Sequence, residues 1–297
     1  MERIDLSGMG VALITPFKSN GDVDFDTLLK LVSMHLSAGT DYLVALGTTA
    51  EMPTLSVEER REITRLVTAQ VNGKIPVVLG LGGNNTREII GRLEAEDFTG
   101  VDALLSATPY YNKPSQEGLF RHYRALSEAS PLPIVLYNVP SRTGVNLCAG
   151  TTLRIANECE NVIAIKEASG NVSQTGEIVR SRPAGFRVIS GDDGMTLPLM
   201  SFGVDGVISV LGNAFPKEFG RMVHFALSGD FRSAQAIHLR FCELFGLLSV
   251  DGNPAGIKCL MSLRGLCENV LRLPLVPATS TTVDRMTAFL AELGIDL

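Results

Sequence analysis

Short apolar runs alternate with longer amphipathic segments along most of this chain. The apolar runs have the length of single buried strands, and the segments between them repeat their apolar residues with helical periodicity. We therefore predict eight strands, at residues 11–17, 42–47, 76–82, 103–108, 133–139, 162–165, 186–191 and 206–211. Helices are predicted at 26–38, from Ser56 onward, and at 86–96, 116–129, 151–157, 195–201 and 216–228. Ser56 and Glu59 have the spacing of a capping box.

Eight strand–helix units in about 230 residues match the size of a closed (β/α)8 barrel. The competing architecture is a doubly wound open sheet, which normally has fewer strands and a phosphate-binding turn after the first strand. Here the first run ends in Thr15-Pro-Phe17 with no such turn, so we predict an α/β protein with a (β/α)8 TIM barrel over residues 1–229. The strands stop at Asp230. Helices at 231–248, 254–266 and 282–293 then predict a C-terminal three-helix region over residues 230–297.

The sixth apolar run ends on a lysine, Lys166. Side chains alternate faces along a strand, so Val162, Ala164 and Lys166 are predicted on one face and Glu167 on the other, away from the lysine. Desolvation at the end of a buried strand favours the neutral amine, which is a nucleophile toward a carbonyl group. The alternative is a lysine that extends to solvent or pairs with a distant acid.

The composition is that of an ordinary globular protein, with 45% hydrophobic and 20% charged residues among 297. The net charge of −6 and the absence of a lysine/arginine block argue against nucleic-acid binding. No apolar run reaches membrane-spanning length, and the segment Met1–Leu6 lacks the pattern of a signal peptide. We therefore expect neither a nucleic-acid nor a membrane partner.

The five cysteines are scattered, odd in number and without CxxC spacing. This usage predicts reduced, mostly buried thiols in a cytoplasmic protein. The four histidines are far apart and lack paired-ligand spacing, so we expect no metal site. The glycine run Gly80–Asn85 has neither the dinucleotide-binding nor the P-loop order, and we interpret it as close packing at a strand end. We expect no cofactor.

Active-site residues of such a barrel lie at the carboxyl ends of its strands. The second strand ends in Gly47-Thr-Thr-Ala-Glu51, whose backbone N–H groups and hydroxyls suit a carboxylate; the alternative is a turn that only caps a helix. The fifth strand ends in Tyr137-Asn-Val-Pro-Ser-Arg142. These residues offer a proton relay and a carboxylate clamp, or else a tyrosine bonded to the backbone and a surface arginine.

Two other strand ends carry paired polar residues, each of which can be interpreted in two ways. Tyr110 and Tyr111 follow the fourth strand in a proline-bracketed loop, and each phenol needs a partner, so the pair belongs to a site or to an interface. Asp192 and Asp193 follow the seventh strand. Paired aspartates can serve metal or acid–base chemistry, but their position directly before a helix favours an N-cap pair.

A strand-end lysine, a tyrosine on the preceding strand end and a carboxylate-binding turn together indicate condensation of a 2-keto acid through a Schiff base. The motifs that carry this combination are GTTAE (47–51), TPYYNKP (108–114), YNVPSRTG (137–144), IKEASG (165–170), SGDD (190–193) and GVISV (206–210). In this order they resemble the dihydrodipicolinate synthase family, within the class I pyruvate aldolase/lyase superfamily. The resemblance runs from Gly10 to the C-terminal helices.

The resemblance implies condensation of pyruvate with L-aspartate 4-semialdehyde to 4-hydroxy-tetrahydrodipicolinate, in lysine and diaminopimelate biosynthesis. It implies Lys166 as the Schiff-base nucleophile and Tyr137, Thr49 and Tyr111 as a proton-relay triad, with Tyr111 supplied by a neighbouring subunit. The further implied residues bind substrate: Thr48 and Thr49 at the pyruvate carboxylate, Arg142 at the semialdehyde carboxylate, and Gly191 and Ile208 at the pyruvate end. The implied assembly is a homotetramer, a dimer of tight dimers.

Departures from the family pattern concern regulation. Lysine-inhibited relatives have a serine–alanine pair and histidines in a cleft where this chain has Met52, Val57 and Arg60, although Asn84 and Glu88 match. We therefore expect weak or absent inhibition by lysine.

Two rival functions remain from the sequence. One is another aldolase of the superfamily, acting on N-acetylneuraminate or a 2-keto-3-deoxy sugar acid, for which Arg142 is the distinguishing residue. The other is a barrel that binds a keto acid without turnover, against which the joint presence of Lys166 and Tyr137 argues.

Overall fold

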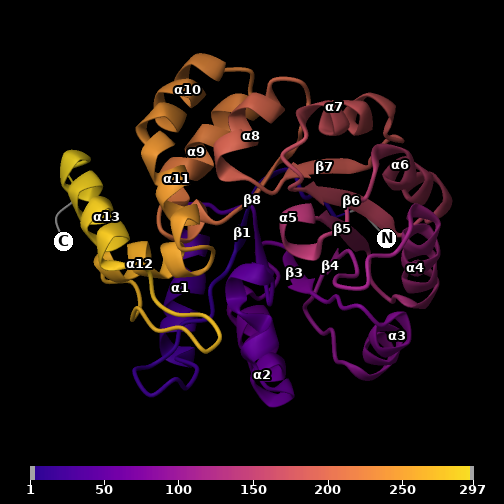
Figure 1. The fold of residues 1–297 in the computed structure, drawn as a ribbon, viewed down its shortest axis with the longest axis horizontal. Coiled ribbons are helices and arrows are strands. Elements are labelled where there is room, and N and C mark those ends of the chain that lie inside the picture. The colour runs from indigo at the N-terminus through magenta and orange to yellow at the C-terminus, as the bar shows by residue number, and fades with distance from the viewer. Residues whose placement is uncertain (1–3, 295–297) are drawn as a thin grey trace.

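The computed structural model describes residues 4–294, and it forms a closed barrel of eight parallel strands in sequential order, with β8 pairing to β1 (Figure 1). Residues 1–3 and 295–297, which the predicted domain bounds include, lie outside the described residues. The strands are β1 (Gly8–Ala12), β2 (Tyr42–Ala45), β3 (Val77–Gly80), β4 (Ala103–Ala107), β5 (Ile134–Asn138), β6 (Val162–Glu167), β7 (Arg187–Ser190) and β8 (Gly206–Ser209). The predicted TIM barrel is therefore confirmed.

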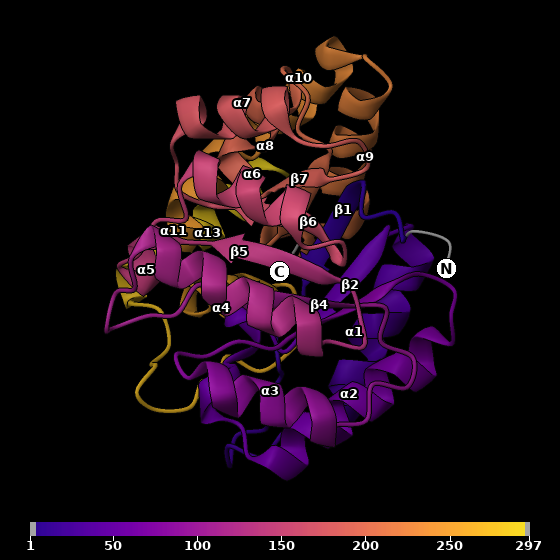
Figure 2. The same cartoon turned by 90° about the vertical axis from the view of Figure 1, so that its right-hand side faces the viewer.

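Helices surround the strands, as the side view in Figure 2 shows for α4, α6 and α7. They are α1 (Phe25–Ala38), α2 (Val57–Val71), α3 (Thr86–Ala95), α4 (Gln116–Ala129), α5 (Pro140–Thr143), α6 (Ala149–Glu158), α7 (Val172–Ser181), α8 (Asp193–Met200), α9 (Pro216–Leu227), α10 (Phe231–Arg240), α11 (Cys242–Val250), α12 (Ala255–Leu263) and α13 (Ser280–Glu292). The capping box of Ser56 and Glu59 is confirmed at the start of α2. The short helix α5 and the whole of α7 were not predicted.

The first strand lies earlier than the predicted segment 11–17, because β1 spans Gly8–Ala12. Glycines conceal it from an apolar pattern, yet they are needed there: a Cβ on Gly10 would lie 2.1 Å from the ring of Tyr42 on the next strand. The N–H of Leu13 still donates to the carbonyl of Val44 on β2, and the chain leaves the ladder after it. The N–H of Ile14 donates to the side-chain oxygen of Asn213, and the Thr15 hydroxyl donates to the carbonyl of Ala50.

The C-terminal region contains four helices among the described residues, so the prediction of three is wrong. The predicted helix 231–248 is broken at Phe241, which is buried and packs its ring 5.0 Å from that of Phe215. The break lets α10 pack against α9 while α11 packs against α12 and α13.

The strand that carries Lys166 contains a bulge. Ile134 pairs with Val162 and Val135 pairs with Ala164, which leaves Ile163 without a partner on β5. Val162 consequently lies in the apolar layer between strands and helices, whereas Ala164 lies inside the barrel. The prediction that Val162 and Ala164 share one face is therefore wrong, although Ala164 and Lys166 do lie on the same side.

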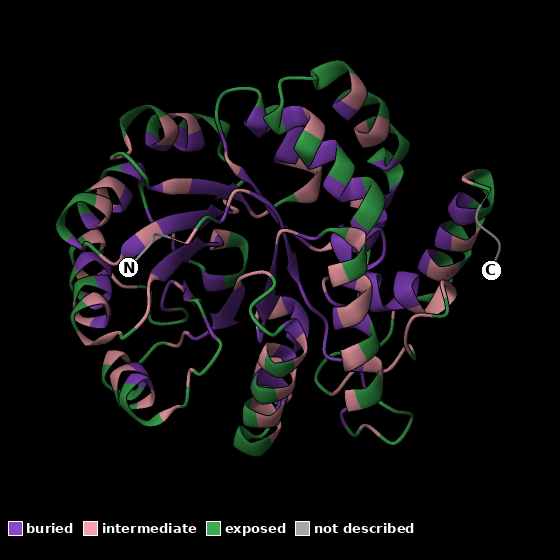
Figure 3. Cartoon of the chain, turned by 180° about the vertical axis from the view of Figure 1, so that it is seen from behind, coloured by how far each residue is buried: buried purple, intermediate pink, exposed green. Residues whose placement is uncertain are grey.

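Two apolar layers hold the barrel together, and Figure 3 shows the strands almost wholly buried inside helices with exposed outer faces. The smaller layer fills the barrel with residues from every strand: Ala12, Tyr42, Val44, Val78, Ala103, Leu105, Val135, Tyr137, Ala164, Ile189 and Ile208. The larger layer lies between the strands and the helices.

The cysteines are less buried than predicted. All five are free, but only Cys159 and Cys259 are buried, while Cys148 and Cys242 are exposed. Among residues 4–294, no helix combines the length and apolar character needed to cross a membrane.

Candidate active site

Lys166 points into the carboxyl end of the barrel, because it follows Ala164 by two residues on β6. Its side chain is only 5% exposed, and its Nζ lies 4.5 Å from the ring centroid of Tyr137, the residue paired with it on β5. Within the described part of the chain, no carboxylate lies within ion-pair distance of this amine. The amine is thus buried next to a phenol ring, with no counter-ion in the described structure.

A cavity of about 220 Å³ opens above Lys166. Most of the predicted site residues line it together: Thr48, Thr49, Tyr137, Arg142, Lys166 and Gly191. Ile208 does not line this cavity; it is buried in the interior layer beneath it. Six residues from four different strand ends therefore meet, as the barrel geometry requires of a site.

Gly191 lies against the side chain of Lys166. A Cβ at this position would stand 2.6 Å from the Cβ of Ala168 and 3.1 Å from the Cε of Lys166. Real Cβ atoms essentially never approach other atoms within 3.0 Å. Only glycine fits there, so the space beside the lysine depends on the absence of a side chain.

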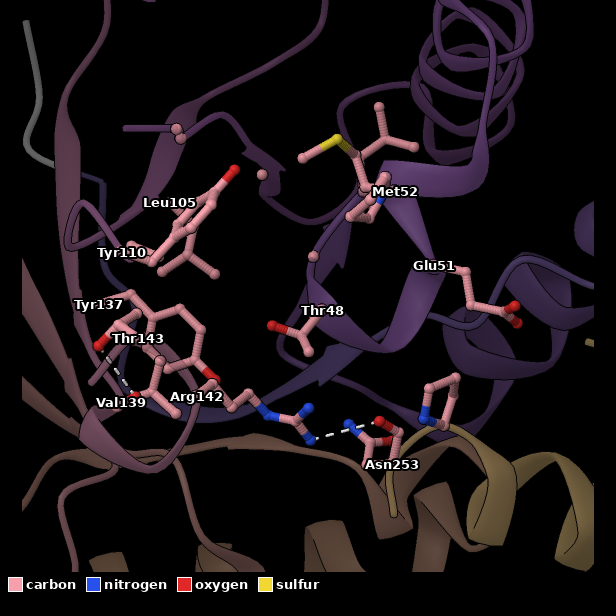
Figure 4. A pocket seen from close by; sticks show the side chains of 18 of the residues that line it. Thr48, Glu51, Met52, Leu105, Tyr110, Tyr137, Val139, Arg142, Thr143 and Asn253 are labelled. Carbon is pink, nitrogen blue, oxygen red and sulfur yellow. Dashed lines mark hydrogen bonds between the residues drawn. The ribbon is translucent and has the colours of Figure 1, made fainter. Parts of the chain in front are cut away.

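The two threonines lie on a single 3-10 turn, Thr48–Ala50, that directly follows β2. Thr48 lines this cavity and also the larger one beside it, which Figure 4 shows. Thr49 is buried, and its hydroxyl oxygen accepts a hydrogen bond of 3.0 Å from the side-chain amide of Asn253. The turn is therefore more than a helix cap, since its hydroxyls are directed to the site and to a distant loop.

Arg142 lies on α5, the four-residue helix that β5 leads into. Its side chain is exposed at the cavity mouth, and its Nη2 donates to the backbone carbonyl of Asn253 at 3.3 Å (Figure 4). The guanidinium has only this bond among the described residues, which leaves donors available to a carboxylate.

Asn253 is the site residue that the sequence did not indicate. It lies between α11 and α12, contacts Thr49 through its side chain and Arg142 through its carbonyl, and has a buried Oδ1 with no partner among the described residues. In the sequence it stands in Asp251-Gly-Asn-Pro254, which signals only a turn between helices.

A second cavity, of about 390 Å³, adjoins the first and shares Thr48, Tyr137, Arg142 and Asn253 with it (Figure 4). Tyr110 lines this larger cavity. Tyr111 lines neither: its side chain is 83% exposed. The chain therefore does not bring its own Tyr111 to Thr49 or Tyr137.

The two aspartates after β7 have different roles. Asp192 is the N-cap of α8 and accepts from the N–H of Met195. Asp193 does not cap; one carboxylate oxygen accepts from the N–H groups of Val210 and Leu211, while the other is buried without a partner among the described residues. Burial raises the pKa of the Asp193 carboxyl, against the lowering effect of these hydrogen bonds. The predicted N-cap pair is thus correct for one member only.

The prediction for Glu167 is confirmed, because its carboxylate points out of the barrel. It accepts from the amides of Asn138 and Gln174 and from the N–H of Ser169. Asn138 pairs with Glu167 in the strand ladder, directly after Tyr137 and Lys166. This network therefore joins the ends of β5 and β6 behind the two central site residues.

The glycine run after β3 is also used as predicted, for close packing. A Cβ on Gly80 would lie 2.1 Å from the carbonyl oxygen of Leu46. The backbone of β3 thereby comes close to the start of the threonine turn.

Comparisons with known proteins agree with this geometry. Residues 5–293 match the dihydrodipicolinate synthetase family. The chain is 59% identical to the 4-hydroxy-tetrahydrodipicolinate synthase of Parabacteroides distasonis, over 99% of each chain. It superimposes on a monomeric dihydrodipicolinate synthase variant with a TM-score of 0.95 and 40% sequence identity, over 98% of this chain and 97% of the other. It also superimposes on the chloride-inhibited dihydrodipicolinate synthase from Acinetobacter baumannii complexed with pyruvate, with a TM-score of 0.94 and 39% sequence identity. That superposition covers 98% of this chain and 100% of the other.

Proposed function

The chain belongs to the dihydrodipicolinate synthetase family, and we propose that it condenses pyruvate with L-aspartate 4-semialdehyde to give 4-hydroxy-tetrahydrodipicolinate. The observation that carries this function is the buried amine of Lys166, which has no counter-ion among residues 4–294, in a cavity shared with Tyr137, Thr48 and Arg142. The enzyme is a Schiff-base-forming lyase of lysine and diaminopimelate biosynthesis. The five free cysteines fit a cytoplasmic location.

The reaction begins when the neutral amine of Lys166 attacks the ketone carbon of pyruvate, and loss of water gives an iminium ion. A proton leaves the methyl group, and the resulting enamine forms the new carbon–carbon bond to the aldehyde carbon. The amino group of the second substrate then attacks the former ketone carbon, which closes the ring and frees the amine of Lys166. These steps need a proton donor or acceptor beside the lysine, and Tyr137, whose ring lies next to the amine, serves as that group.

The threonine turn and Arg142 bind the carboxylates of different substrates. Thr48 and Thr49 hold the carboxylate of pyruvate close to Lys166, where Gly191 leaves room for the keto acid. Arg142 stands at the mouth and binds the carboxylate of the semialdehyde. A short carboxylated aldehyde suits this single charged group better than a polyhydroxylated sugar acid does, which disfavours the rival aldolases.

The relay of Tyr137 and Thr49 is completed by Tyr111 of a second copy of the chain. The support is its exposure of 83% on its own chain, where a phenol has no partner among the described residues. A separate apolar patch on α7 and after α8, in which Val172 and Phe202 are exposed beside the partly buried Val179, supports a second contact between copies. Two distinct contacts of this kind build a homotetramer as a dimer of dimers.

Borohydride trapping tests the central step. Incubation with pyruvate followed by reduction is expected to leave one adduct, and peptide mass spectrometry should place it on Lys166. Consumption of pyruvate should then require L-aspartate 4-semialdehyde and should not occur with sugar-derived aldehydes. An adduct on another residue would refute the mechanism, and turnover with a sugar aldehyde alone would refute the substrate.

A further inference from the structure

A fully buried ion pair joins the C-terminal helices to the threonine turn. The Nζ of Lys258, on α12, lies 2.5 Å from Oε1 of Glu51, and both side chains have no exposed surface. The same ammonium donates to the carbonyl of Val270 at 2.9 Å and lies 4.0 Å from the ring centroid of Phe17. The other carboxylate oxygen of Glu51 accepts from the N–H of Arg272 at 3.1 Å. Both oxygens and the ammonium are therefore engaged.

Glu51 ends the turn that carries the site threonines. Its N–H donates to the carbonyl of Thr48 at 3.2 Å, and its own backbone has a φ of 54°. Leu46, just before the turn, has the same φ. Left-handed backbone is unfavourable for both residue types and persists only where the surroundings enforce it. Glu51 is among the residues that line the larger cavity, and Figure 4 shows its carboxylate on the opposite side of the turn from the side chain of Thr48.

The C-terminal region holds this turn at a second point. Asn253, two residues before α12 begins, donates to the hydroxyl of Thr49, and Lys258 on the same helix holds Glu51. The residues are 204 and 207 positions apart in the chain. One helix and the residues that lead into it therefore fix the side chain of Thr49 and the backbone that follows it.

Stability alone does not account for a pair of this kind. Removing two charges from water is energetically costly, and well-packed apolar side chains often stabilise a core equally well or better. Unlike apolar groups, the ion pair fixes the orientation of the Glu51 side chain, because the carboxylate must face the ammonium and accept hydrogen bonds at both oxygens. The residue whose orientation is fixed in this way is the one that ends the threonine turn.

We propose that Lys258 and Glu51 are positioning residues for the keto-acid carboxylate, which set the placement of Thr48 and Thr49 from outside the cavity over Lys166. This inference rests on the proposed function, in which the threonine turn receives the carboxylate of pyruvate. Neither residue reaches the reacting atoms: the side chain of Lys258 does not line the cavity over Lys166. Their effect is on binding of the first substrate.

The test replaces the pair by neutral groups of similar shape, in the double variant Glu51→Gln, Lys258→Met. Pyruvate is titrated against borohydride-trapped adduct on Lys166, without the second substrate. Half-saturation is expected to rise about tenfold, since a misplaced binding group weakens binding without preventing the chemistry. The KM for the semialdehyde is expected to stay within about twofold, because Arg142 is not attached to the pair.

A matched control uses the ion pair of Arg182 and Asp205, which lies at the opposite end of the barrel, where Asp205 directly precedes β8. Asp205→Asn should lower the melting temperature without moving the half-saturation for pyruvate. A second variant, Glu51→Asp, keeps both charges and is expected to raise the half-saturation because the shorter carboxylate reaches Lys258 only if the turn moves. If the double variant does not fold, the Glu51→Asp variant still tests the positioning role.

The outcomes separate the two proposals. If the folded variants trap pyruvate with the half-saturation of the wild type, the positioning role is refuted while the function stands. If the wild type traps pyruvate but does not consume the semialdehyde, the second substrate is refuted and the positioning role is still measured. If the wild type forms no adduct, both are refuted.

Discussion

The contact between Gly191 and Lys166 makes the substitution Gly191→Ala a sharp test of the site geometry. The added Cβ would stand 2.6 Å from the Cβ of Ala168 and 3.1 Å from the Cε of Lys166. Carbon atoms pack at roughly 3.5–4.0 Å, so one of these groups must move by about 1 Å. Ala168 follows β6 directly and its N–H is bonded to the carbonyl of Asn138, so the clash with its Cβ requires a shift of the backbone at residue 191. The flexible end of the Lys166 side chain yields to the second contact.

The size of the effect follows from that displacement. Overpacking of this kind costs about 1–3 kcal/mol of stability, which a folded domain of this size tolerates. A reacting group displaced by about 1 Å loses on the order of 100-fold in rate. We therefore expect kcat/KM for pyruvate to fall about 100-fold, with a much smaller change in the melting temperature.

The assay measures pyruvate consumption by steady-state kinetics, the rate of adduct formation on Lys166 by borohydride trapping, and thermal unfolding. Gly91→Ala is the control: Gly91 lies within α3, and a Cβ there would meet no atom within 4 Å. It should raise stability by up to about 1 kcal/mol through helix propensity and leave the kinetics unchanged. A Gly191→Ala enzyme whose kcat/KM lies within threefold of the wild type would refute the argument.

Three further predictions concern Tyr137, regulation and pH. Tyr137→Phe keeps the ring over Lys166 but removes the hydroxyl; kcat should fall about 10²- to 10⁴-fold while the pyruvate adduct still forms, and an unchanged kcat would exclude the proton relay. Lysine at sub-millimolar concentration should not inhibit steady-state turnover, because Met52, Val57 and Arg60 replace the cleft residues of lysine-inhibited relatives; strong inhibition in a lysine titration would contradict this. Burial raises the pKa of Asp193 above 3.8, so the folded protein holds that proton more tightly than the unfolded chain does. Its stabilising effect is complete below about pH 4 and is lost as the pH rises through the folded value. The melting temperature of Asp193→Asn relative to the wild type should therefore increase from pH 4 toward neutrality, and a constant difference would count against this assignment.

The sequence predicts most of this fold because strand and helix patterns are local. The eight strands were placed correctly in number and order, and only the first was shifted, since Gly8 and Gly10 carry no apolar side chain to mark it. The bulge at Ile163 was invisible for a related reason. In a run of apolar residues the sequence does not show which side chains face the barrel interior once a bulge leaves one residue without a partner on the neighbouring strand.

The helix break at Phe241 shows the limit of helical periodicity. The segment 231–248 was predicted as a single helix, yet the structure breaks it at Phe241, whose ring is buried against that of Phe215. Tertiary packing of one aromatic ring outweighs the small difference in propensity between one long helix and two short ones.

The sequence by itself determined the barrel, the strand ends and the residue types placed there, because alternation and periodicity fix which side chains reach the carboxyl end. Lys166, Tyr137 and the threonine turn were found in this way, whereas Gly191 was implied only by the family resemblance. Only the tertiary structure decided what holds them, since the contacts of Asn253 with Thr49 and of Lys258 with Glu51 span more than 200 residues of chain. No local pattern records such a contact, because its two halves are brought together by closure of the barrel and by the packing of the C-terminal helices across its mouth.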